Sequence, residues 1–416
     1  MKNMENLYAE RKMRMLKGKT VVLGVTGGIA AYKIASLASR LRKNHCNVEV
    51  IMTENARNFI TPNTFEALTG NRCITDTFDR NHSFEIEHIS LARKADYFMI
   101  APASADIIGK IAGGIADDML STTVMACRCP VSVVPSMNTK MFENPIVQDN
   151  IRKLEKFGYN IIRPATGYLA CGDTGAGKMP EPEELFSYIL KELAFPKDMK
   201  GLKVLVTAGA TQEAIDPVRY ITNHSSGKMG YAIAEACMLR GTETILVSGQ
   251  TALEPVKFVK NISVVSAADM AEAVKENYSD CDIIIKAAAV ADYTPAEYTD
   301  RKIKKSDGDM SVKLKRTEDI LEWLGKNKSE NQFICGFSME TENLIENSRK
   351  KLVRKNADMI ACNSIAQKGA GFKADTNVLT LITREKQLPL ELMSKASASH
   401  KLLDFILSEI KSDEKK

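Results

Sequence analysis

Three side chains in the first half of the chain, His88, Asn138 and Cys171, have the functional groups for proton transfer and carboxylate binding. His88 is one of five histidines, and an imidazole titrates close enough to neutral pH to act as acid, base or partner of a carboxylate. Asn138 follows an apolar segment, where its amide could bind a carboxylate or a flavin edge, or simply hold a turn. For His88 the structural alternative is a surface or satisfied histidine.

Cys171 lies in a stretch from Pro164 to Pro182 in which Gly and Pro are very dense. We predict neither helix nor strand there, and a loop of this length is typical of an active-site lid. A thiol on such a lid could deliver a proton once the lid closes. A spare cysteine in a floppy loop is the alternative.

The segment GVTGGI, which includes Gly27 and Gly28, is predicted to connect a strand to a helix. Free backbone N–H groups and the helix dipole favour a phosphate at such a place, although a tight structural turn would look the same. The spacing is not G-x-G-x-x-G, and the next strand ends at Thr53 rather than at the acid that binds a dinucleotide ribose. A mononucleotide such as FMN therefore fits better than NAD.

Further polar groups are expected at the same edge of the predicted sheet. They lie in APASAD with Ser104, in DDMLST with Ser121 and Thr122, and in PSMNTKM with Asn138. Ligands of open α/β sheets bind at the carboxyl ends of the strands, so we expect these loops to converge on one crevice.

The second half carries a basic set of residues around a predicted helix start. The string DPVRYITNHSSGKMG contains Arg219 and Asn223 and ends in a Ser-Ser-Gly-Lys turn, an anion site that does not have Walker A spacing. Lysines then recur in KIKK, which begins at Lys302, and at Lys351 and Lys355, four residues apart on a predicted helix. Each cluster alone could be a solvated basic face, but together they favour a triphosphate.

The elements that position these groups repeat along the chain. GKTVVLGVTGG from Gly18 and GLKVLVTAGAT from Gly201 each begin a strand, turn, helix, strand order. Later apolar strands do not alternate, which is typical of parallel sheets covered on both faces. We predict an α/β fold of two tandem doubly wound, mostly parallel-sheet domains: a flavodoxin-like domain over 18–195 and a Rossmann-like domain over 200–411.

Composition narrows the function classes. The 416 residues carry a net charge of +5, too little to imply a nucleic-acid partner. The nine cysteines lack zinc spacing, and we expect most of them to be buried as small apolar side chains. No stretch approaches the roughly 18 apolar residues of a membrane span, and the N-terminus does not resemble a secretory signal. We expect a cytoplasmic protein without a membrane partner.

The strings GVTGGIAAYK, EHISLARKAD, APASAD, PSMNTKM and LACGDTGAGKMPEP resemble the flavin-dependent cysteine decarboxylases over about residues 18 to 190. The resemblance implies FMN as cofactor, His88 as the catalytic histidine, Asn138 on the substrate carboxylate and Cys171 as proton donor. The FMN contacts that we expect are Gly27, Gly28, Thr53, Ser104, Ser121 and Thr122.

The strings DPVRYITNHSSGKMG, AAAVADY, KIKK, GFSMET and KLVRKNADMIACN resemble the phosphopantothenoylcysteine synthetases over about residues 200 to 410. This resemblance implies a ligase that uses CTP with Mg²⁺ and forms an acyl-cytidylate; Arg219 and Asn223 would handle the acyl group, with Lys302 at the active site. The expected CTP contacts are Ala287, Ala288, Ala289, Asp292, Lys302, Phe337, Lys351 and Lys355, and no Mg²⁺ ligand is predicted.

Together the two halves resemble the bifunctional proteins of coenzyme A biosynthesis. The resemblance implies 4′-phosphopantothenate and cysteine as substrates, 4′-phosphopantetheine as product, and a homo-oligomer, with trimers of the first half and dimers of the second giving a dodecamer. A peptidyl-cysteine decarboxylase, a regulatory flavoprotein without activity and a dinucleotide-dependent oxidoreductase are the alternatives. Of these, the second-half motifs disfavour the first, the presence of His88, Asn138 and Cys171 the second, and Thr53 the third.

Overall fold

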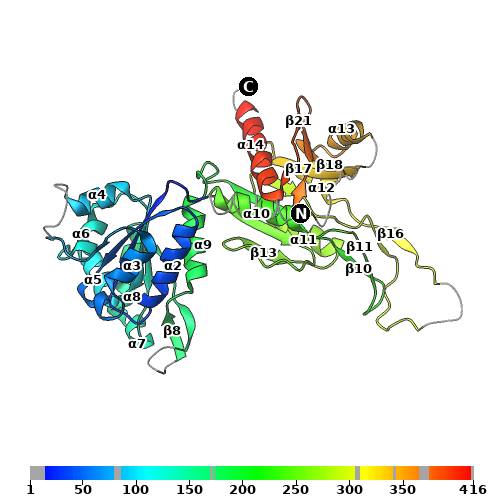
Figure 1. The fold of residues 1–416 in the computed structure, drawn as a ribbon. Helices are drawn as coiled ribbons and strands as arrows, with labels where there is room; N and C mark the ends of the chain where they lie inside the picture. The colour runs from blue at the N-terminus through cyan, green and yellow to red at the C-terminus, as the bar shows by residue number, and fades with distance from the viewer. Residues whose placement is uncertain are drawn as a thin grey trace. The chain divides into compact units, whose positions relative to one another are not determined.

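The computed structural model describes residues 15–78, 86–168, 172, 174–304, 310–340, 343–364 and 374–413. The chain forms two compact units that divide between Phe195 and Pro196 (Figure 1). Each unit is built on its own sheet, with helices connecting the strands. The predicted α/β class, with two tandem doubly wound and mostly parallel sheets, is confirmed.

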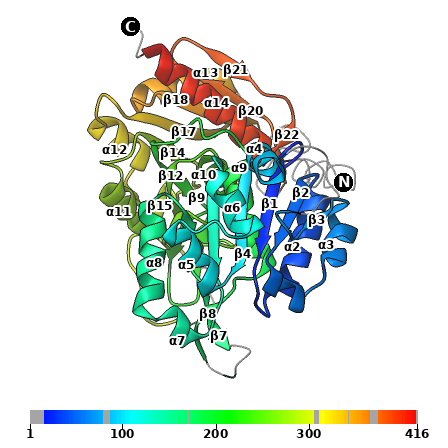
Figure 2. The ribbon, with the colours of Figure 1, turned by 90° about the vertical axis from the view of Figure 1, so that its left-hand side faces the viewer.

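The first unit has a six-stranded parallel sheet in the order β3-β2-β1-β4-β5-β6, and Figure 2 shows β2, β1 and β4 side by side. Its strands are β1 (Thr20–Val25), β2 (Asn47–Met52), β3 (Cys73–Ile74), β4 (Tyr97–Ala103), β5 (Val131–Pro135) and β6 (Asn160–Ile161). Its helices are α2 (Ala31–Lys43), η1 (Glu54–Asn58), α3 (Pro62–Thr69), α4 (Glu87–Lys94), α5 (Ala105–Gly113), α6 (Met119–Ala126), α7 (Thr139–Phe142), α8 (Pro145–Lys156) and α9 (Pro182–Leu193).

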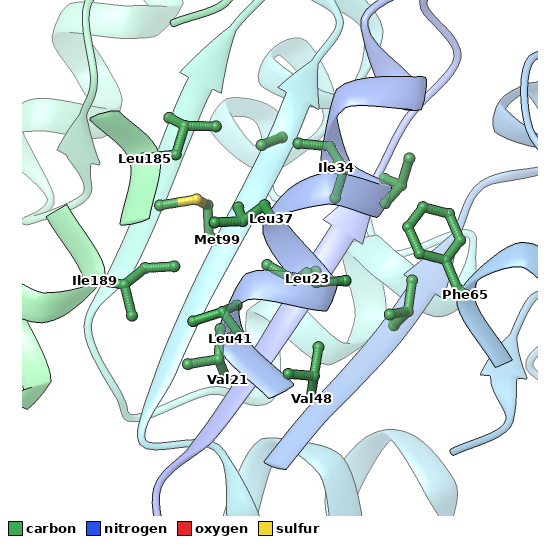
Figure 3. Packing of buried hydrophobic residues seen from close by; sticks show 14 of the residues in the cluster. Val21, Leu23, Ile34, Leu37, Leu41, Val48, Phe65, Met99, Leu185 and Ile189 are labelled. Atoms are coloured by element: carbon green, nitrogen blue, oxygen red, sulfur yellow. The ribbon is translucent and has the colours of Figure 1, made fainter. Parts of the chain in front are cut away.

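Helices cover both faces of this sheet, which is why its strands are continuously apolar. On one face α2, α3 and α9 pack against β1, β2 and β4, and Figure 3 shows Leu37 of α2 and Leu185 of α9 pointing toward Met99 of β4. All three side chains are fully buried, and burying one such side chain is worth about 1.5–3 kcal/mol. On the other face α4, α5, α6 and α8 cover the sheet.

The second unit has an eight-stranded sheet in the order β13-β12-β9-β14-β17-β18-β20-β21, parallel except for β20 and β21 at one edge. Its strands are β9 (Lys203–Ala208), β12 (Glu243–Ser248), β13 (Lys260–Ser263), β14 (Ile283–Lys286), β17 (Phe333–Glu340), β18 (Met359–Ser364), β20 (Leu379–Ile382) and β21 (Gln387–Pro389). The helices α10 (Lys228–Leu239) and α14 (Lys395–Asp413) cover one face, and α11 (Ala267–Asn277), α12 (Ile320–Asn327) and α13 (Leu344–Arg354) cover the other.

Small two-stranded ladders lie outside the two main sheets. They are β10 (Gln212–Ala214) with β11 (Tyr220–Thr222), β15 (Tyr293–Pro295) with β16 (Leu314–Arg316), β19 (Thr376–Asn377) with β22 (Met393–Ser394), and β7 (Ala165–Tyr168) with β8 (Thr174–Lys178).

The β7–β8 ladder corrects the prediction that the stretch from Pro164 to Pro182 contains no strand. Glycine is a poor strand former, so its density there indicated a loop. In the structure the glycines of β8 instead permit close packing: a Cβ on Gly175 would lie 2.5 Å from Thr139 Oγ1, and one on Gly177 would lie 2.2 Å from the Met137 carbonyl oxygen. The glycines of β8 therefore mark a close backbone approach rather than irregular backbone.

Candidate active sites

Thr26 joins two of the strand ends that the sequence predicts to converge in the first unit. Its buried hydroxyl donates to the Pro102 carbonyl oxygen at 2.7 Å and accepts from the Ser104 backbone N–H at 3.0 Å. The first connects β1 to the end of β4, and the second reaches the start of α5. Sequence reasoning missed Thr26 because its position before two glycines indicates only a turn.

The loop with Gly27 and Gly28 has the features of a phosphate site. A Cβ at Gly27 would lie 2.6 Å from the Asn55 Cβ, so only glycine allows this loop to pack there. The following helix, α2, has no side-chain cap at Ala30 and no acidic residue in its first turn, which leaves its positive dipole end without a carboxylate of its own. Neutral N–H donors without an acid are the donor set that a phosphate prefers, so the residues fit the FMN phosphate.

Thr53 lies next to this loop, because its backbone N–H donates to the Val25 carbonyl oxygen at 3.0 Å. Ser104 caps α5, where its hydroxyl accepts from the Ile107 N–H at 3.4 Å. Both residues are therefore at the carboxyl edge of the sheet, where the sequence predicts them.

Ser121 and Thr122 lie in the first turn of α6. Ser121 is fully buried, and its hydroxyl donates to Asp118 Oδ1 at 2.8 Å in a capping box. Its side chain thus stabilises the helix start, a role that the sequence reasoning did not assign. The side chain of Thr122 is partly exposed.

His88 is the second residue of α4 and is partly buried. The helix precedes β4 in a parallel sheet, so its first turn lies toward the strands' carboxyl ends, and it packs on α6. Topology therefore places His88 at the edge that carries the phosphate loop.

Asn138 caps the short helix α7, with its Oδ1 accepting from the Lys140 N–H at 2.9 Å. The turn-holding alternative is thus correct for this oxygen. Cys171, the predicted proton donor, lies outside the described residues.

The β7–β8 ladder packs against the segment that holds Asn138. The Met137 N–H donates to the Gly177 carbonyl oxygen at 3.2 Å, and Gly175 meets Thr139 on the other side of Asn138. The strand that follows Cys171, β8, thereby contacts the backbone around Asn138, and β7 is linked to it by pairing with β8.

Replacing Gly177 by Ala is expected to lower the decarboxylation that the sequence motifs predict at least tenfold, because the added Cβ cannot fit 2.2 Å from the Met137 oxygen and the contact beside Asn138 must open. Gly158 is a matched control: it also has a positive φ, +87° against +134°, but nothing lies within 4 Å of an added Cβ. Turnover of supplied 4′-phosphopantothenoylcysteine by both variants measures the difference. Equal turnover of the two variants would show that the contact is unimportant.

In the second unit, glycines allow backbone segments to pack closely at the carboxyl end of β9. Gly209 and Gly227 both have positive φ, and a Cβ at Gly209 would lie 2.9 Å from the Gly249 carbonyl oxygen. Gly227 is the N-cap residue of α10, so the Ser-Ser-Gly-Lys turn does stand at a helix start, as predicted.

The loop with Ala287, Ala288 and Ala289 is fixed to the end of β9. The Ala289 N–H donates to the Gly209 carbonyl oxygen at 2.9 Å, and the Ala288 N–H donates to Thr207 Oγ1 at 3.1 Å. This loop follows β14, the neighbour of β9 on the side where the strand order reverses. Such a reversal is the usual ligand position in an open α/β sheet.

The structure brings Asn223 to this same loop. Its Nδ2 lies 3.3 Å from the Ala289 carbonyl oxygen and 3.2 Å from that of Val290. Asp292 is exposed just beyond, and its carbonyl oxygen accepts from the Thr317 N–H at 3.0 Å. Asn223 and the loop with Ala289, which the sequence predicts from distant segments, therefore lie in contact.

Arg219 holds the segment that carries Lys302. Its guanidinium donates to Asp216 Oδ2 at 2.6 Å and to the Ile303 carbonyl oxygen at 2.8 Å, while the Ile303 N–H donates back to Asp216 Oδ2 at 3.2 Å. Burial would raise the pKa of Asp216, but Arg219 and the surrounding N–H groups outweigh it and hold that pKa below its usual range. Asp216 was not identified from the sequence, because its partner Ile303 lies 87 residues further along the chain.

Phe337, Lys351 and Lys355 come together where α13 packs on β17. Lys351 Nζ donates to the Phe337 carbonyl oxygen at 3.1 Å. Lys355 is only 6% exposed and pairs with Asp319 at 2.9 Å and Glu322 at 2.6 Å. Burial lowers its pKa, but the two carboxylates raise it further, so Lys355 stays charged and joins α13 to α12.

Lys286, the last residue of β14, lies near Lys351, Lys355 and Asp319. The sequence analysis does not single it out. Burial and then the charge of Lys351 lower the pKa of Lys286 to about 8. A lysine directly after three isoleucines was the available signal, because a charge at the end of a buried strand faces the carboxyl edge.

The described residues contain no group of three or more His, Cys, Asp or Glu side chains placed to hold a metal ion. Six cysteines are buried, as expected for small apolar side chains: Cys46, Cys73, Cys237, Cys281, Cys335 and Cys362. Within the same ranges no helix is long and apolar enough to cross a membrane.

Comparison with known families agrees with this division of sites. Residues 9–194 match the flavoprotein family, and residues 199–410 match the DNA/pantothenate metabolism flavoprotein C-terminal domain. Fold and matches together define a flavoprotein joined to a pantothenate-metabolism domain.

Curated relatives cover nearly the whole chain. The coenzyme A biosynthesis bifunctional protein CoaBC of Bacillus subtilis is 47% identical over 94% of this chain and 97% of its own length. Those of Haemophilus influenzae and Escherichia coli K12 are 43% and 40% identical, each over 94% of this chain and 98% of their own. The chain belongs to the family of bifunctional coenzyme A biosynthesis proteins. It is an enzyme with phosphopantothenoylcysteine decarboxylase and phosphopantothenate–cysteine ligase activities, as the sequence motifs predicted.

Proposed function

We propose that the chain joins cysteine to 4′-phosphopantothenate with CTP and Mg²⁺ over residues 200–411, and decarboxylates the product to 4′-phosphopantetheine with FMN over residues 18–195. The observation that supports this best is the meeting of Asn223 with the loop of Ala289 at the strand-order reversal. The motifs that carry the resemblance converge there from distant parts of the sequence.

In the ligase half, the substrate carboxylate attacks the α-phosphorus of CTP and pyrophosphate leaves. The cysteine amine then attacks the acyl carbon of the acyl-cytidylate, and CMP leaves. Lys302 neutralises charge that develops on the phosphates, and Asn223 orients the acyl group. Nε and Nη2 of Arg219 donate to Asp216 and to the Ile303 carbonyl oxygen, so we assign Arg219 the positioning of Lys302 in addition to any contact of Nη1 with the acyl group.

The nucleotide would lie along the carboxyl ends of β9, β14 and β17. Ala287, Ala288 and Ala289 would offer backbone groups to it, and Asp292 would receive a ribose hydroxyl or the base amino group. Phe337, Lys351 and Lys355 line the next strand and helix, with Lys355 acting through its partners because both carboxylates already occupy it. Mg²⁺ would arrive with the triphosphate.

In the decarboxylase half, FMN would be held by the loop of Gly27 and Gly28, by Thr53 and Ser104, and by the first turn of α6 with Ser121 and Thr122. When bound, FMN supplies reversible oxidation of the substrate thiol carbon, which lets CO₂ leave. Asn138 would orient the carboxylate that is lost, His88 would move a proton at the imidazole, and Cys171 would donate a proton to the decarboxylated intermediate as it is reduced to the product.

Mass spectrometry of the products tests the whole proposal. The purified chain is incubated with 4′-phosphopantothenate, cysteine, Mg²⁺ and either CTP or ATP. We expect 4′-phosphopantetheine with CTP and much less with ATP. Accumulation of 4′-phosphopantothenoylcysteine would contradict the decarboxylase assignment, and formation of neither product would contradict the ligase assignment.

The resemblance also supports a homo-oligomer that acts in the cytoplasm, where these water-soluble substrates are available. Trimeric contacts of the first unit combined with dimeric contacts of the second would give a dodecamer. The native mass of the purified chain in solution tests this, since a monomer would contradict it.

A further inference from the structure

Lys286 occupies the central position of the second sheet. It ends β14 and pairs in parallel register with Thr207 of β9 and with Gly336 of β17. The strand order reverses between β9 and β14, so Lys286 stands at the reversal. Alternation along the strand places it on the same face as Ile284, which packs in the core under α11, α12 and α13.

The charges that face Lys286 do not neutralise it. They are Lys351 and Lys355 on α13, Asp319 at the start of α12, and Asp292 in the loop after β14. Asp319 is already paired with Lys355, and Glu322 beside it is paired with Lys355 and Lys326.

Within the described part of the chain the Lys286 ammonium has neither a hydrogen bond nor an ion pair of its own. Its side chain is partly exposed, so a ligand can reach it. An amine that is partly buried beside two other lysines is poorly stabilised as a cation, which is the reason that its pKa falls to about 8. The missing component of this cluster is an anion.

We propose that Lys286 is a phosphate ligand of the nucleotide site, in addition to the residues that the family resemblance assigns. The inference rests on the proposed use of CTP, and it follows from the position of Lys286 at the strand-order reversal between the loop of Ala287 and the lysines of α13. A triphosphate there supplies negative charge in addition to that of Asp292 and Asp319, which together do not offset burial and the two neighbouring lysines.

This role couples nucleotide binding to protonation. Near pH 8 about half of the Lys286 side chains are neutral in the free protein, and a bound phosphate raises the pKa by favouring the ammonium form. Binding therefore takes up as much as about half a proton per chain near pH 8, and much less near pH 6.5, where Lys286 is already charged. Affinity at this position weakens as the pH rises above about 8.

Isothermal titration calorimetry of the full chain with Mg²⁺ and CTP measures this uptake directly. Titrations are made at pH 8 and pH 6.5 in two buffers of different ionisation enthalpy, without 4′-phosphopantothenate or cysteine. We expect Lys286→Met to weaken CTP binding by about tenfold to a hundredfold, as for loss of a charged hydrogen bond, and to abolish its share of the proton uptake.

Two variants control the measurement. Lys286→Arg keeps a charge that does not titrate, so we expect near-normal affinity without the uptake at pH 8. Lys350→Met removes an exposed lysine of α13 that pairs with Glu346, and we expect it to bind and take up protons like the unaltered chain.

Circular dichroism and thermal unfolding of each variant, compared with the unaltered chain, show whether the second unit, which carries Lys286, is folded. Unaltered affinity and uptake in Lys286→Met would overturn the role of Lys286 while leaving the use of CTP intact. An unaltered chain that does not bind CTP would overturn both. If Lys286→Met does not fold, Lys286→Arg still decides: uptake that persists in it would contradict the inference.

Discussion

Replacing Lys302 by Gln is expected to lower ligase turnover by about a hundredfold to a thousandfold, the usual loss when one group that stabilises transition-state charge is removed. Lys302 is exposed, and within the described ranges its ammonium has no hydrogen-bond or ion-pair partner of its own, so its charge is available to the substrate. The backbone beside Lys302 is fixed because the Ile303 N–H donates to Asp216 Oδ2. This contact positions Lys302 but leaves its side chain unrestrained. Initial rates of pyrophosphate release measure the loss.

Lys304 provides the matched control for this substitution. It lies two residues further on, is equally exposed, and is on the other side of Ile303. We expect Lys304→Gln to keep at least half of the ligase turnover, and both variants to decarboxylate supplied 4′-phosphopantothenoylcysteine normally. Equal losses in the two variants would mean that only general positive charge matters at this segment.

Replacing His88 by Asn is expected to lower decarboxylation by about a hundredfold to ten-thousandfold, the range for loss of a general acid or base. The residue is partly buried in the first turn of α4, at the sheet edge that also carries Gly27 and Gly28. Release of CO₂ from 4′-phosphopantothenoylcysteine measures the change.

His45→Asn is the control in the same unit. His45 is exposed in the turn after α2 with a φ of 60°, a conformation that Asn adopts readily. We expect no change in either activity. A His88→Asn chain that decarboxylates as fast as His45→Asn would remove His88 from the site, and a chain that also loses ligase activity would indicate a folding defect.

Local patterns predicted the fold well because they are set by neighbouring residues. The apolar runs before Gly24 and Gly209 did become central parallel strands. The ladder around Cys171 was missed because its strands are defined by contacts with Met137 and Thr139, some forty residues earlier, rather than by their own propensity.

The sites were predicted as sets of residues but not as networks. Asn223 and Lys302 could be selected by resemblance, whereas Thr26 and Asp216 act through carbonyl and N–H groups that lie far along the chain. Spacing in the sequence cannot show such partners, since the contact exists only after folding. Lys286 was missed for another reason, because a single lysine at a strand end is common. What distinguishes Lys286 is that the carboxylates near it do not offset burial and the charges of the neighbouring lysines.

The Arg219–Asp216 pair implies that ionic strength will act unequally within the ligase site. Asp216 is 2% exposed, so added salt will scarcely screen its attraction to Arg219, whereas the exposed ammonium of Lys302 is open to counterions. Rising salt will therefore weaken the binding of phosphates by Lys302 and leave the Arg219–Asp216 pair intact. The ligase should lose affinity for CTP, its proposed substrate, in concentrated electrolyte and regain it fully on dilution.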